Sequence, residues 1–392
     1  MTPRQPADAR VRRADRLGLA TFVTLGLPDG MIGAAWPSIR HSLHASVGDL
    51  GLVLLAYTAG AVAVSLTVGG AMRRAGVGGL LAASAVLAAG AAVLSAVAPT
   101  LGLLAGAGVL FGVAGGMMDG GLNTALVQTG RSHRLNLLHG FYGVGTTIGP
   151  LLVTASVAGG SWRPAYAALA GIDLLVGASW AVSSRHDPPS PPPQERPPGR
   201  PLSRAAVAGM AVFFVYTGLE VGAGQWEATF GRGHLHLSAA GAGLATSSYW
   251  WALTAVRLTL GLLKRPPGHP AIVRGGSALA LAGTGLIWWA PSTGVAVAGF
   301  VVVGGALAGI FPALVALTPA RVGTAAAGRV VPWQIGAAVV GGAGLSAVIG
   351  VVLQTSGLAA LGPALTALAV LLVAGEVLLR RTHVRFGAIG ST

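Results

Sequence analysis

The chain has 392 residues, of which 53 % are hydrophobic and only 9 % are charged, and its mean hydropathy of +0.71 excludes a soluble enzyme with a separate polar domain. Its formal net charge of +14 would indicate nucleic-acid binding in a soluble protein, but in a chain this apolar it indicates loops attracted to anionic lipid headgroups. The absence of cysteine excludes disulfides, thiol catalysis and thiolate metal sites.

Twelve apolar stretches are each long enough to cross a bilayer, which takes about 20 residues of helix. In the first half of the chain they lie near residues 17–39, 47–70, 77–98, 101–128, 135–158 and 164–183. In the second half they lie near residues 204–230, 239–263, 271–290, 293–317, 330–352 and 358–379. The sequence therefore predicts an all-α integral membrane protein with 12 transmembrane helices.

The basic residues fall almost entirely on alternate loops. If the N-terminus is cytoplasmic, 21 of the 25 basic residues lie inside, Arg257 lies within a helix, and only Arg40, Arg163 and Arg232 lie outside. One missed helix would invert every later loop and destroy this bias. We therefore expect a multi-pass protein of the cytoplasmic (inner) membrane with both termini in the cytoplasm.

Residues 184–203 form a proline-rich segment that can neither form a helix nor enter lipid, which predicts a cytoplasmic linker. It separates an N-terminal six-helix bundle (1–183) from a C-terminal one (204–392). At a constant offset of 192, Gly51, Tyr57, Gly69, Arg73 and Gly76 recur as Gly243, Tyr249, Gly261, Arg265 and Gly268. A weaker match pairs Gly143 and Gly149 with Gly336 and Gly342. Two pseudo-symmetric halves of this kind are typical of transporters that open alternately to the two sides of a membrane.

Acidic side chains inside a span need a partner, a water-filled cavity or a function. Asp29 follows Pro28 near the middle of the first span, where the proline bends the helix. Asp119 and Asn123 are four residues apart and share one face of the fourth span. We predict that Asp29 and Asp119 couple transport to protons and that Asn123 binds substrate. Structural hydrogen bonding or helix packing is the alternative for each of them.

The seventh span carries a second group of polar residues. Tyr216 and Glu220 are four residues apart, so they share one face of the helix. We expect Glu220 to couple transport to protons. We expect Tyr216, and Trp226 further along the same helix, to bind substrate. Glu227 lies near the outer end of this span, and we expect it to be solvated.

Further substrate-binding candidates are aromatic or polar side chains within spans. His139 and Tyr142 share a face of the fifth span, and Tyr249 lies in the eighth. Trp333 and Gln334 follow Pro332 in the eleventh. Packing is the alternative for His139, and an interfacial anchor is the alternative for Trp333.

No enzyme signature is present: the chain has no nucleophile elbow, no His-Glu-x-x-His helix and no phosphate-binding loop. His234 and His236 have no further ligand nearby. We therefore expect neither an enzyme nor a metal site nor a cofactor, and the energy for transport must come from a gradient.

The 12-helix plan with its central cytoplasmic linker resembles the major facilitator superfamily. The segments Leu135–Pro150 (LNLLHGFYGVGTTIGP), Tyr216–Trp226 (YTGLEVGAGQW) and Pro332–Gly336 (PWQIG) are similar to helices five, seven and eleven of its fucose-permease-like branch. The resemblance implies proton-coupled movement of sugars or sugar-like solutes, with acids in helices one and four near the substrate. Asp29 and Asp119 hold those positions here.

One motif departs from the family. The loop between helices two and three usually reads Gly-x-x-x-Asp-Arg-x-Gly, whereas this chain carries Arg73 and Arg74 between its glycines, and Arg265 at the repeated place. The usual acidic lock between the halves is therefore altered. We predict that Arg73, Arg74 and Arg265 gate the transporter together with Arg257, for which pairing with a carbonyl or carboxylate is the structural alternative.

These patterns lead to a secondary active transporter that moves a small, polar, sugar-like solute with protons by alternating access. Its expected partners are the solute, protons and the bilayer; nucleic acid is not expected, and we expect a monomer. The alternative is a proton-antiport exporter of an amphipathic drug or antibiotic, whose cavity would be lined with Trp and Tyr. A non-transporting membrane sensor or scaffold is a third hypothesis.

Overall fold

The computed structural model describes residues 5–65, 67–128, 135–184, 202–263 and 265–387, and every regular element within them is helical. Most of the predicted linker and several of the basic loop residues lie outside the described residues. The chain forms two compact units, Met1–Ala45 with Leu52–Glu195, and Ser46–Gly51 with Arg196–Thr392.

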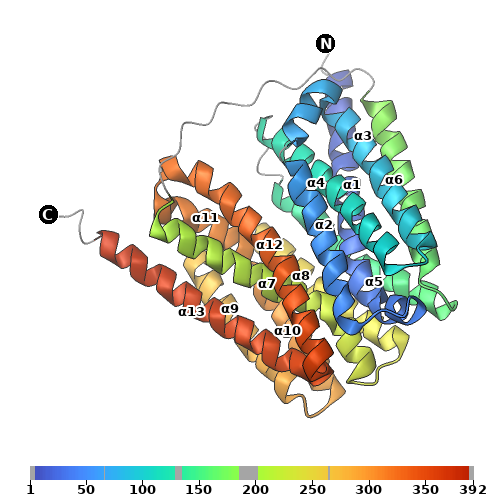
Figure 1. The fold of residues 1–392 in the computed structure, drawn as a ribbon. Helices are drawn as coiled ribbons and strands as arrows, with labels where there is room; N and C mark the ends of the chain where they lie inside the picture. The colour runs from blue at the N-terminus through green and yellow to red at the C-terminus, as the bar shows by residue number, and fades with distance from the viewer. Residues whose placement is uncertain (1–4, 66, 129–134, 185–201, 264, 388–392) are drawn as a thin grey trace. The chain divides into compact units, whose positions relative to one another are not determined.

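The first unit contains the first six spans (Figure 1). They are α1 (Gln5–Ser42), α2 (Leu50–Ser65), α3 (Val68–Val97), α4 (Leu101–Gln128), α5 (Leu135–Ala158) and α6 (Arg163–Ser183). The 3-10 turn at Val47–Asp49, just before α2, is counted with the second unit. The span predicted over 47–70 ends earlier, at Ser65. The next helical segment, from Val68, is then interrupted at Gly76, whose φ of 69° is accessible to glycine because it has no Cβ.

The second unit contains α7 (Arg204–Gly233), α8 (Ala239–Leu262), α9 (His269–Trp289), α10 (Thr293–Leu307), α11 (Ile310–Val322), α12 (Thr324–Ser356) and α13 (Leu361–Gly387). Because α10 and α11 are two pieces of one span, the described helices amount to twelve crossings, as the sequence predicts. Eleven of them are long and apolar enough to span a membrane by composition. The exception is α8, which contains two serines, three threonines and Arg257.

The break between α10 and α11 has a local cause. In a continuous helix the N–H of residue 312 would donate to the carbonyl of Ala308, but residue 312 is proline and has no N–H. The preceding Gly309 caps the start of α11. The predicted single helix over 293–317 is therefore two helices, and the carbonyls at the break are left to other donors.

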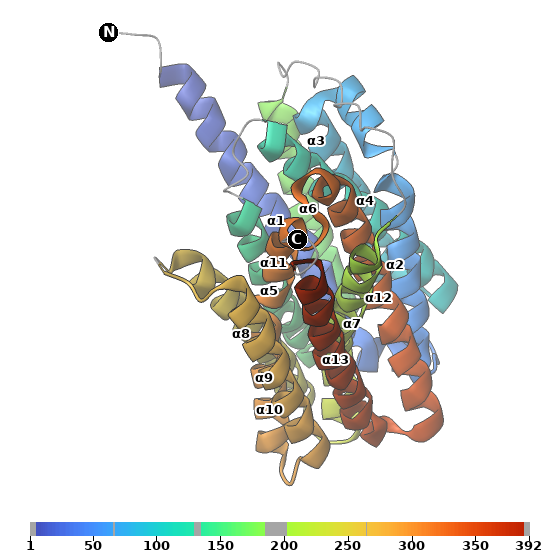
Figure 2. The same cartoon turned by 90° about the vertical axis from the view of Figure 1, so that its left-hand side faces the viewer.

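The same helix pairs pack in both units. α5 lies along α1 as α12 lies along α7, and α6 packs on α3 as α13 packs on α9; the packing of α10 on α8 and α9 is visible in Figure 2. Close backbone contacts repeat as well. A Cβ at Gly112 of α4 would collide with the Tyr57 carbonyl, and one at Gly304 of α10 would collide with the Tyr249 carbonyl. Both residues of the second contact follow those of the first by 192, which agrees with the predicted internal repeat.

Hydrogen bonds from side chains at both ends of α6 join it to its neighbours in the first unit. The Trp162 Nε1 donates to the Ser42 hydroxyl at 3.0 Å, and the Trp180 Nε1 donates to the Thr21 hydroxyl at 2.8 Å. The Arg163 guanidinium donates to the carbonyls of Ala96 and Ala98, both at 2.8 Å, and so satisfies acceptors at the end of α3.

Candidate functional site

In the first unit, a hydrogen bond inside the membrane-spanning region joins α1 to α5. The Tyr142 hydroxyl donates to Asp29 Oδ2 at 2.7 Å, and both side chains are partly buried. Tyr142 is brought there because glycines allow the two helices to approach closely: a Cβ at Gly26 of α1 would collide with the Tyr142 carbonyl. The structure thus brings together two side chains that the sequence proposes as site residues.

A second acidic group of the same unit lies on α4. The Asn123 Nδ2 donates to Asp119 Oδ1 at 2.8 Å, so the two side chains share one helix face as predicted. Tyr57 of α2 interacts electrostatically with both Asp29 and Asp119. Its hydroxyl lies against Gly115 of α4, where a larger residue would meet it. Because Tyr57 interacts with the charges of both acids, we group these residues as the Asp29 cluster (Asp29, Tyr57, Asp119, Asn123 and Tyr142).

The remaining candidates of this unit lie outside that cluster. The His139 ring packs edge-on against Phe22 of α1, with ring centroids 5.3 Å apart. Arg73 and Arg74 are exposed in the helical segment before Gly76, and Arg73 Nη1 donates to the Gly69 carbonyl at 3.2 Å.

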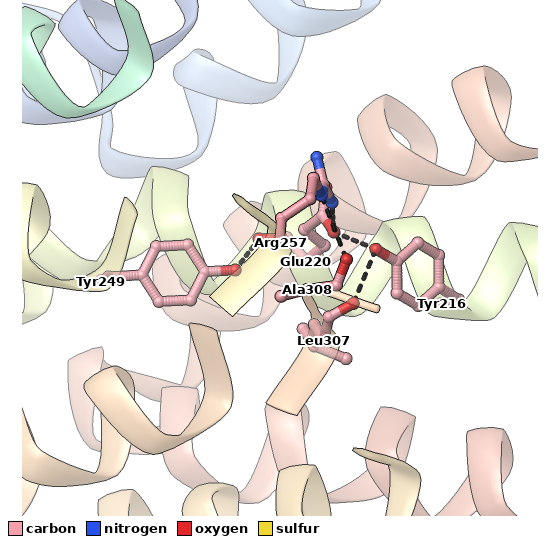
Figure 3. Close-up of polar contacts among 6 residues, drawn as sticks. All are labelled: Tyr216, Glu220, Tyr249, Arg257, Leu307 and Ala308. Carbon is pink, nitrogen blue, oxygen red and sulfur yellow. Dashed lines mark hydrogen bonds and ion pairs between the residues drawn. The ribbon is translucent and has the colours of Figure 1, made fainter. Parts of the chain in front are cut away.

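In the second unit, Glu220 of α7 is the centre of a polar cluster (Figure 3). The Tyr216 hydroxyl donates to Glu220 Oε2 from one turn earlier on α7. Arg257 of α8 forms an ion pair with the same oxygen at 3.5 Å, and the two charged side chains are only 16 % and 19 % exposed. The structure therefore gives Arg257 a carboxylate partner, which is the structural alternative considered for it.

The broken helix contributes two acceptors to this cluster. Arg257 Nε donates to the Ala308 carbonyl at 3.0 Å, and the Tyr216 hydroxyl is 3.2 Å from the Leu307 carbonyl (Figure 3). These are carbonyls at the end of α10, where the helical hydrogen bonds stop. Irregular backbone inside a membrane protein needs such internal partners because lipid offers none. We call Tyr216, Glu220, Arg257, Leu307 and Ala308 the Glu220 cluster.

Tyr249 is fully buried on α8 and contacts the same part of α7 through its backbone. Its hydroxyl donates to the Glu220 carbonyl oxygen at 2.7 Å, and its ring packs edge-on against Trp250. This hydrogen bond holds the backbone of α7 at Glu220. It does not involve the Glu220 carboxylate.

The other candidates of the second unit have different surroundings. Trp226 is fully buried, and its Nε1 lies 2.9 Å from the Ser346 carbonyl of α12. Gln334 is buried and accepts a hydrogen bond from the Thr318 hydroxyl at 2.8 Å. Trp333 is 60 % exposed, and Arg265 is exposed near the start of the segment after α8.

The expectation for Glu227 was wrong. We expected a solvated carboxylate, but the side chain is 2 % exposed. The physical reason is that α7 continues to Gly233 and packs near Glu227 against Trp250 of α8 and Gly350 of α12, so this part of the helix is covered by neighbours instead of water.

Two features of the site were missed from the sequence. Tyr57 was noted only as a repeat position, although its match to Tyr249, a predicted substrate-binding residue, was a signal that it belongs to a site. The carbonyl acceptors of the Glu220 cluster were not foreseen, although Gly309 and Pro312 are the residue types that interrupt a helix.

These helices and their pairing match a known family. The model of the Major Facilitator Superfamily matches residues 18–350. The chain belongs to the major facilitator superfamily. It is therefore a multi-pass membrane protein and a secondary transporter, not an enzyme. A comparison with curated proteins found no significant match.

Solved transporters of the superfamily share the fold at low sequence identity. A bacterial homologue of the human lysosomal transporter Spinster, in an inward-facing and unoccupied conformation, gives a TM-score of 0.74 at 13 % identity and covers 98 % of this chain and 99 % of its own. The E. coli fucose:proton symporter FucP gives 0.62 at 14 % identity, covering 94 % and 98 %. The human organic anion transporter TETRAN gives 0.65 at 18 % identity, covering 93 % and 99 %. Identities this low show a common fold and nothing finer.

The two clusters of this superfamily transporter offer different chemistry. The Asp29 cluster combines two carboxyl groups with hydroxyl and amide groups, which can exchange protons and bind hydroxylated molecules. The Glu220 cluster holds its carboxylate against a guanidinium, so its charges balance.

Proposed function

We propose that this protein moves a small, polar, sugar-like solute across the cytoplasmic membrane together with protons, and that Asp29, Asp119 and Glu220 are the coupling acids. The hydrogen bond between Tyr142 and Asp29 is the observation that carries the proposal. This hydrogen bond holds a carboxyl group inside a membrane span, next to a hydroxyl group. The chain belongs to a family of secondary transporters, whose energy comes from gradients.

Proton coupling follows from alternating exposure of such a group. A carboxyl group in a dry environment is more stable with its proton, and contact with water favours release of the proton. If the transporter exposes Asp29 to one side of the membrane and then to the other, each cycle carries a proton across. The Tyr142 hydroxyl can donate to Asp29 in its ionised form and still accept from its protonated form.

Glu220 couples in a different way because its partner is Arg257. A proton arriving at Glu220 cancels the carboxylate charge and weakens the ion pair across α7 and α8. The hydrogen bond from Arg257 Nε to the Ala308 carbonyl remains. We propose that Arg257 thereby gates the movement of α8 against the α10–α11 break.

The substrate class rests on the polar groups of the two clusters and on the three segments that resemble the fucose-permease-like branch. Hydroxyl, amide and carboxyl groups are the partners that sugars and polyols need. The fucose:proton symporter shares the fold over 94 % of this chain, in support of this class. We propose Asn123, His139, Tyr142, Tyr216, Trp226, Tyr249, Trp333 and Gln334 as the substrate-binding residues.

Orientation and gating follow from the basic residues. The excess of arginine on alternate loops supports cytoplasmic termini, and the exposed Arg73, Arg74 and Arg265 lie on connections assigned to that side. We propose that these three arginines take part in closing the cytoplasmic gate and that the protein works as a monomer.

The experiment begins with a thermal-shift screen of the purified protein against sugars, polyols and antibiotics, because a ligand that binds the native state stabilises it. The best ligand is then tested in proteoliposomes carrying the wild type, Asp29→Asn or Asp29→Glu. We expect Asp29→Asn to lose accumulation driven by a proton gradient but to keep exchange between labelled and unlabelled ligand. Asp29→Glu retains a proton carrier and serves as the matched control.

Accumulation by Asp29→Asn at the wild-type rate contradicts the assignment of Asp29. The direction of movement is tested in the same vesicles: symport loads the compartment that protons enter, whereas export of an amphipathic drug by antiport loads the opposite one. A ligand found only among the antibiotics, with antiport, would replace the sugar proposal by the exporter.

A further inference from the structure

Glu227 is an acidic side chain of α7 to which the proposed function gives no role. It is 2 % exposed, and both of its carboxyl oxygens are buried without a hydrogen-bond partner among the described residues. It follows Glu220 by seven residues, which is nearly two full helical turns. The two acids therefore lie on the same side of α7, about 10 Å apart along the axis.

The side chains around Glu227 do not supply a countercharge. One turn earlier, the Trp250 ring lies against Gly224, and the Trp250 Nε1 is itself buried without an acceptor. Tyr249 interacts electrostatically with Glu227, but its hydroxyl donates to the Glu220 carbonyl instead. The neighbouring Arg257 is bound to Glu220 and Ala308.

The charged groups of the other helices packed against α7 lie near its opposite end. α10 carries no titratable residue. On α13, Gly375 packs against Val212 of α7, which places the adjacent Glu376 level with a residue roughly 22 Å along the axis from Glu227. The described charged side chains of these helices are Arg321 of α11, Arg329 of α12, and Glu376 and Arg380 of α13. Arg321 interacts with Glu376 and so belongs to that same end.

Beyond Glu227 along the chain, the nearest titratable residues are Arg232 of α7 and His234, which caps the end of that helix. Both are exposed, and His234 stacks on Phe230 at 4.8 Å between ring centroids. They therefore extend away from the buried turn that holds Glu227. The Glu227 carboxyl group is thus buried with neither a hydrogen bond nor an ion pair among the described residues.

We propose that Glu227 is a further proton-binding site of this transporter, in addition to the three coupling acids. A carboxylate without hydrogen bonds or a countercharge is far less stable in such surroundings than the neutral acid, so the group binds a proton when it is enclosed as seen here. The proton is released to water when α7 and α8 separate and water reaches the side chain. The reaction is a simple protonation of one carboxyl oxygen and needs no other reactant.

This site is independent of the proposed roles of Asp29 and Glu220. Glu220 Oε2 pairs with the Arg257 guanidinium and accepts a hydrogen bond from the Tyr216 hydroxyl, whereas the Glu227 carboxyl oxygens have no such partner among the described residues. Glu220 and Glu227 can therefore be compared within one helix, as an acid with an ion-pair partner and an acid without one. The proposal can hold even if the substrate is not a sugar.

Infrared spectroscopy of the purified protein in lipid nanodiscs tests the proposal without a substrate. The carbonyl absorption of protonated carboxylic acids is recorded as a function of pH for the wild type, Glu227→Gln, Glu227→Asp and Glu220→Gln. We expect Glu227→Gln to lose the signal of one protonated acid near neutral pH, and Glu227→Asp to retain a titrating acid. Glu220→Gln should keep the Glu227 signal. An unchanged spectrum in Glu227→Gln overturns the proposal.

A second measurement uses only the wild-type protein and so does not depend on the folding of a variant. Dicyclohexylcarbodiimide reacts with protonated carboxyl groups in apolar surroundings, and the modified peptide is identified by mass spectrometry. We expect more adduct on Glu227 than on Glu220, because Glu220 is held in an ion pair with Arg257 whereas Glu227 has no ion pair among the described residues. Equal labelling of the two residues, or more labelling of Glu220, contradicts the proposal. Neither result bears on Asp29, so a failure here is distinguishable from a failure of the proposed function.

Discussion

Replacing Arg257 by methionine should destabilise the protein strongly, because it leaves the Glu220 carboxylate without its countercharge inside a span. At 3.5 Å the two charges attract by about 5 kcal/mol if the effective dielectric constant is about 20. Removing one partner of a buried pair typically costs about 3–5 kcal/mol, since the remaining charge stays buried. We therefore expect Arg257→Met to lower the free energy of unfolding by about 3–5 kcal/mol, part of it from the Ala308 carbonyl that loses its donor.

The test is a double-mutant cycle measured by unfolding in mixed micelles followed by circular dichroism. The variants are Arg257→Met, Glu220→Gln and the double variant, in which no net charge is left unpaired. We expect a coupling energy of about 2–3 kcal/mol, in the upper part of the range for contacting residues. The double variant should therefore be more stable than the sum of the single effects predicts.

A matched pair on α13 gives the control. Arg380 and Glu376 are closer, at 2.7 Å, but the Arg380 side chain is 46 % exposed. The Glu376 side chain is 5 % exposed, but the water around Arg380 screens the pair, and a screened pair four residues apart on a helix contributes only about 0.3–0.5 kcal/mol. We predict that Glu220 and Arg257, although they are farther apart, have a larger coupling energy than Glu376 and Arg380, because both side chains of the first pair are enclosed by protein. A coupling energy between Glu220 and Arg257 no greater than that between Glu376 and Arg380 would refute the reasoning.

Three further predictions follow from the helix contacts. Tyr142→Phe removes the hydroxyl that donates to the carboxylate of α1 and should cost about 1.5 kcal/mol in unfolding experiments, with slower gradient-driven uptake of the screened ligand; an unchanged stability contradicts the hydrogen bond. Gly304→Leu places a side chain on the Tyr249 carbonyl and should lower the unfolding free energy by more than about 2 kcal/mol, whereas Gly275→Leu, with open space around it, should be near neutral. Pro312→Ala restores a backbone donor at the α10–α11 break, so amide exchange across residues 308–312 should slow; equal exchange would show that proline does not cause the break.

Much of the fold was predictable because the bilayer sets the length of each element. The predicted span over 135–158 coincides with α5 (Leu135–Ala158), and the one over 101–128 coincides with α4 (Leu101–Gln128). Hydropathy fails where a local backbone preference overrides it. The break at Gly309 lies inside a fully apolar stretch, so no change in hydropathy marks it.

The site was predictable where one helix carries the whole pattern. The four-residue spacings gave the contact between Asp119 and Asn123 and that between Tyr216 and Glu220. Contacts between helices were not predictable in the same way, because spacing along a helix does not tell which face meets which neighbour. Glu227 shows this: its position along α7 indicated water, but its direction from the helix axis decides that it is buried.

Because one span is divided at Ala308 and Gly309, its two helices, α10 and α11, can tilt relative to each other. The second, α11, has 13 residues and is therefore roughly 20 Å long. A rotation of about 10° at the joint moves its far end by roughly 3–4 Å for an arm of that length. Since Gly323 connects that end directly to α12, a small tilt beside Arg257 is converted into a displacement at the membrane surface. An unbroken helix of the same length would have to tilt along its whole length to move its end by the same distance.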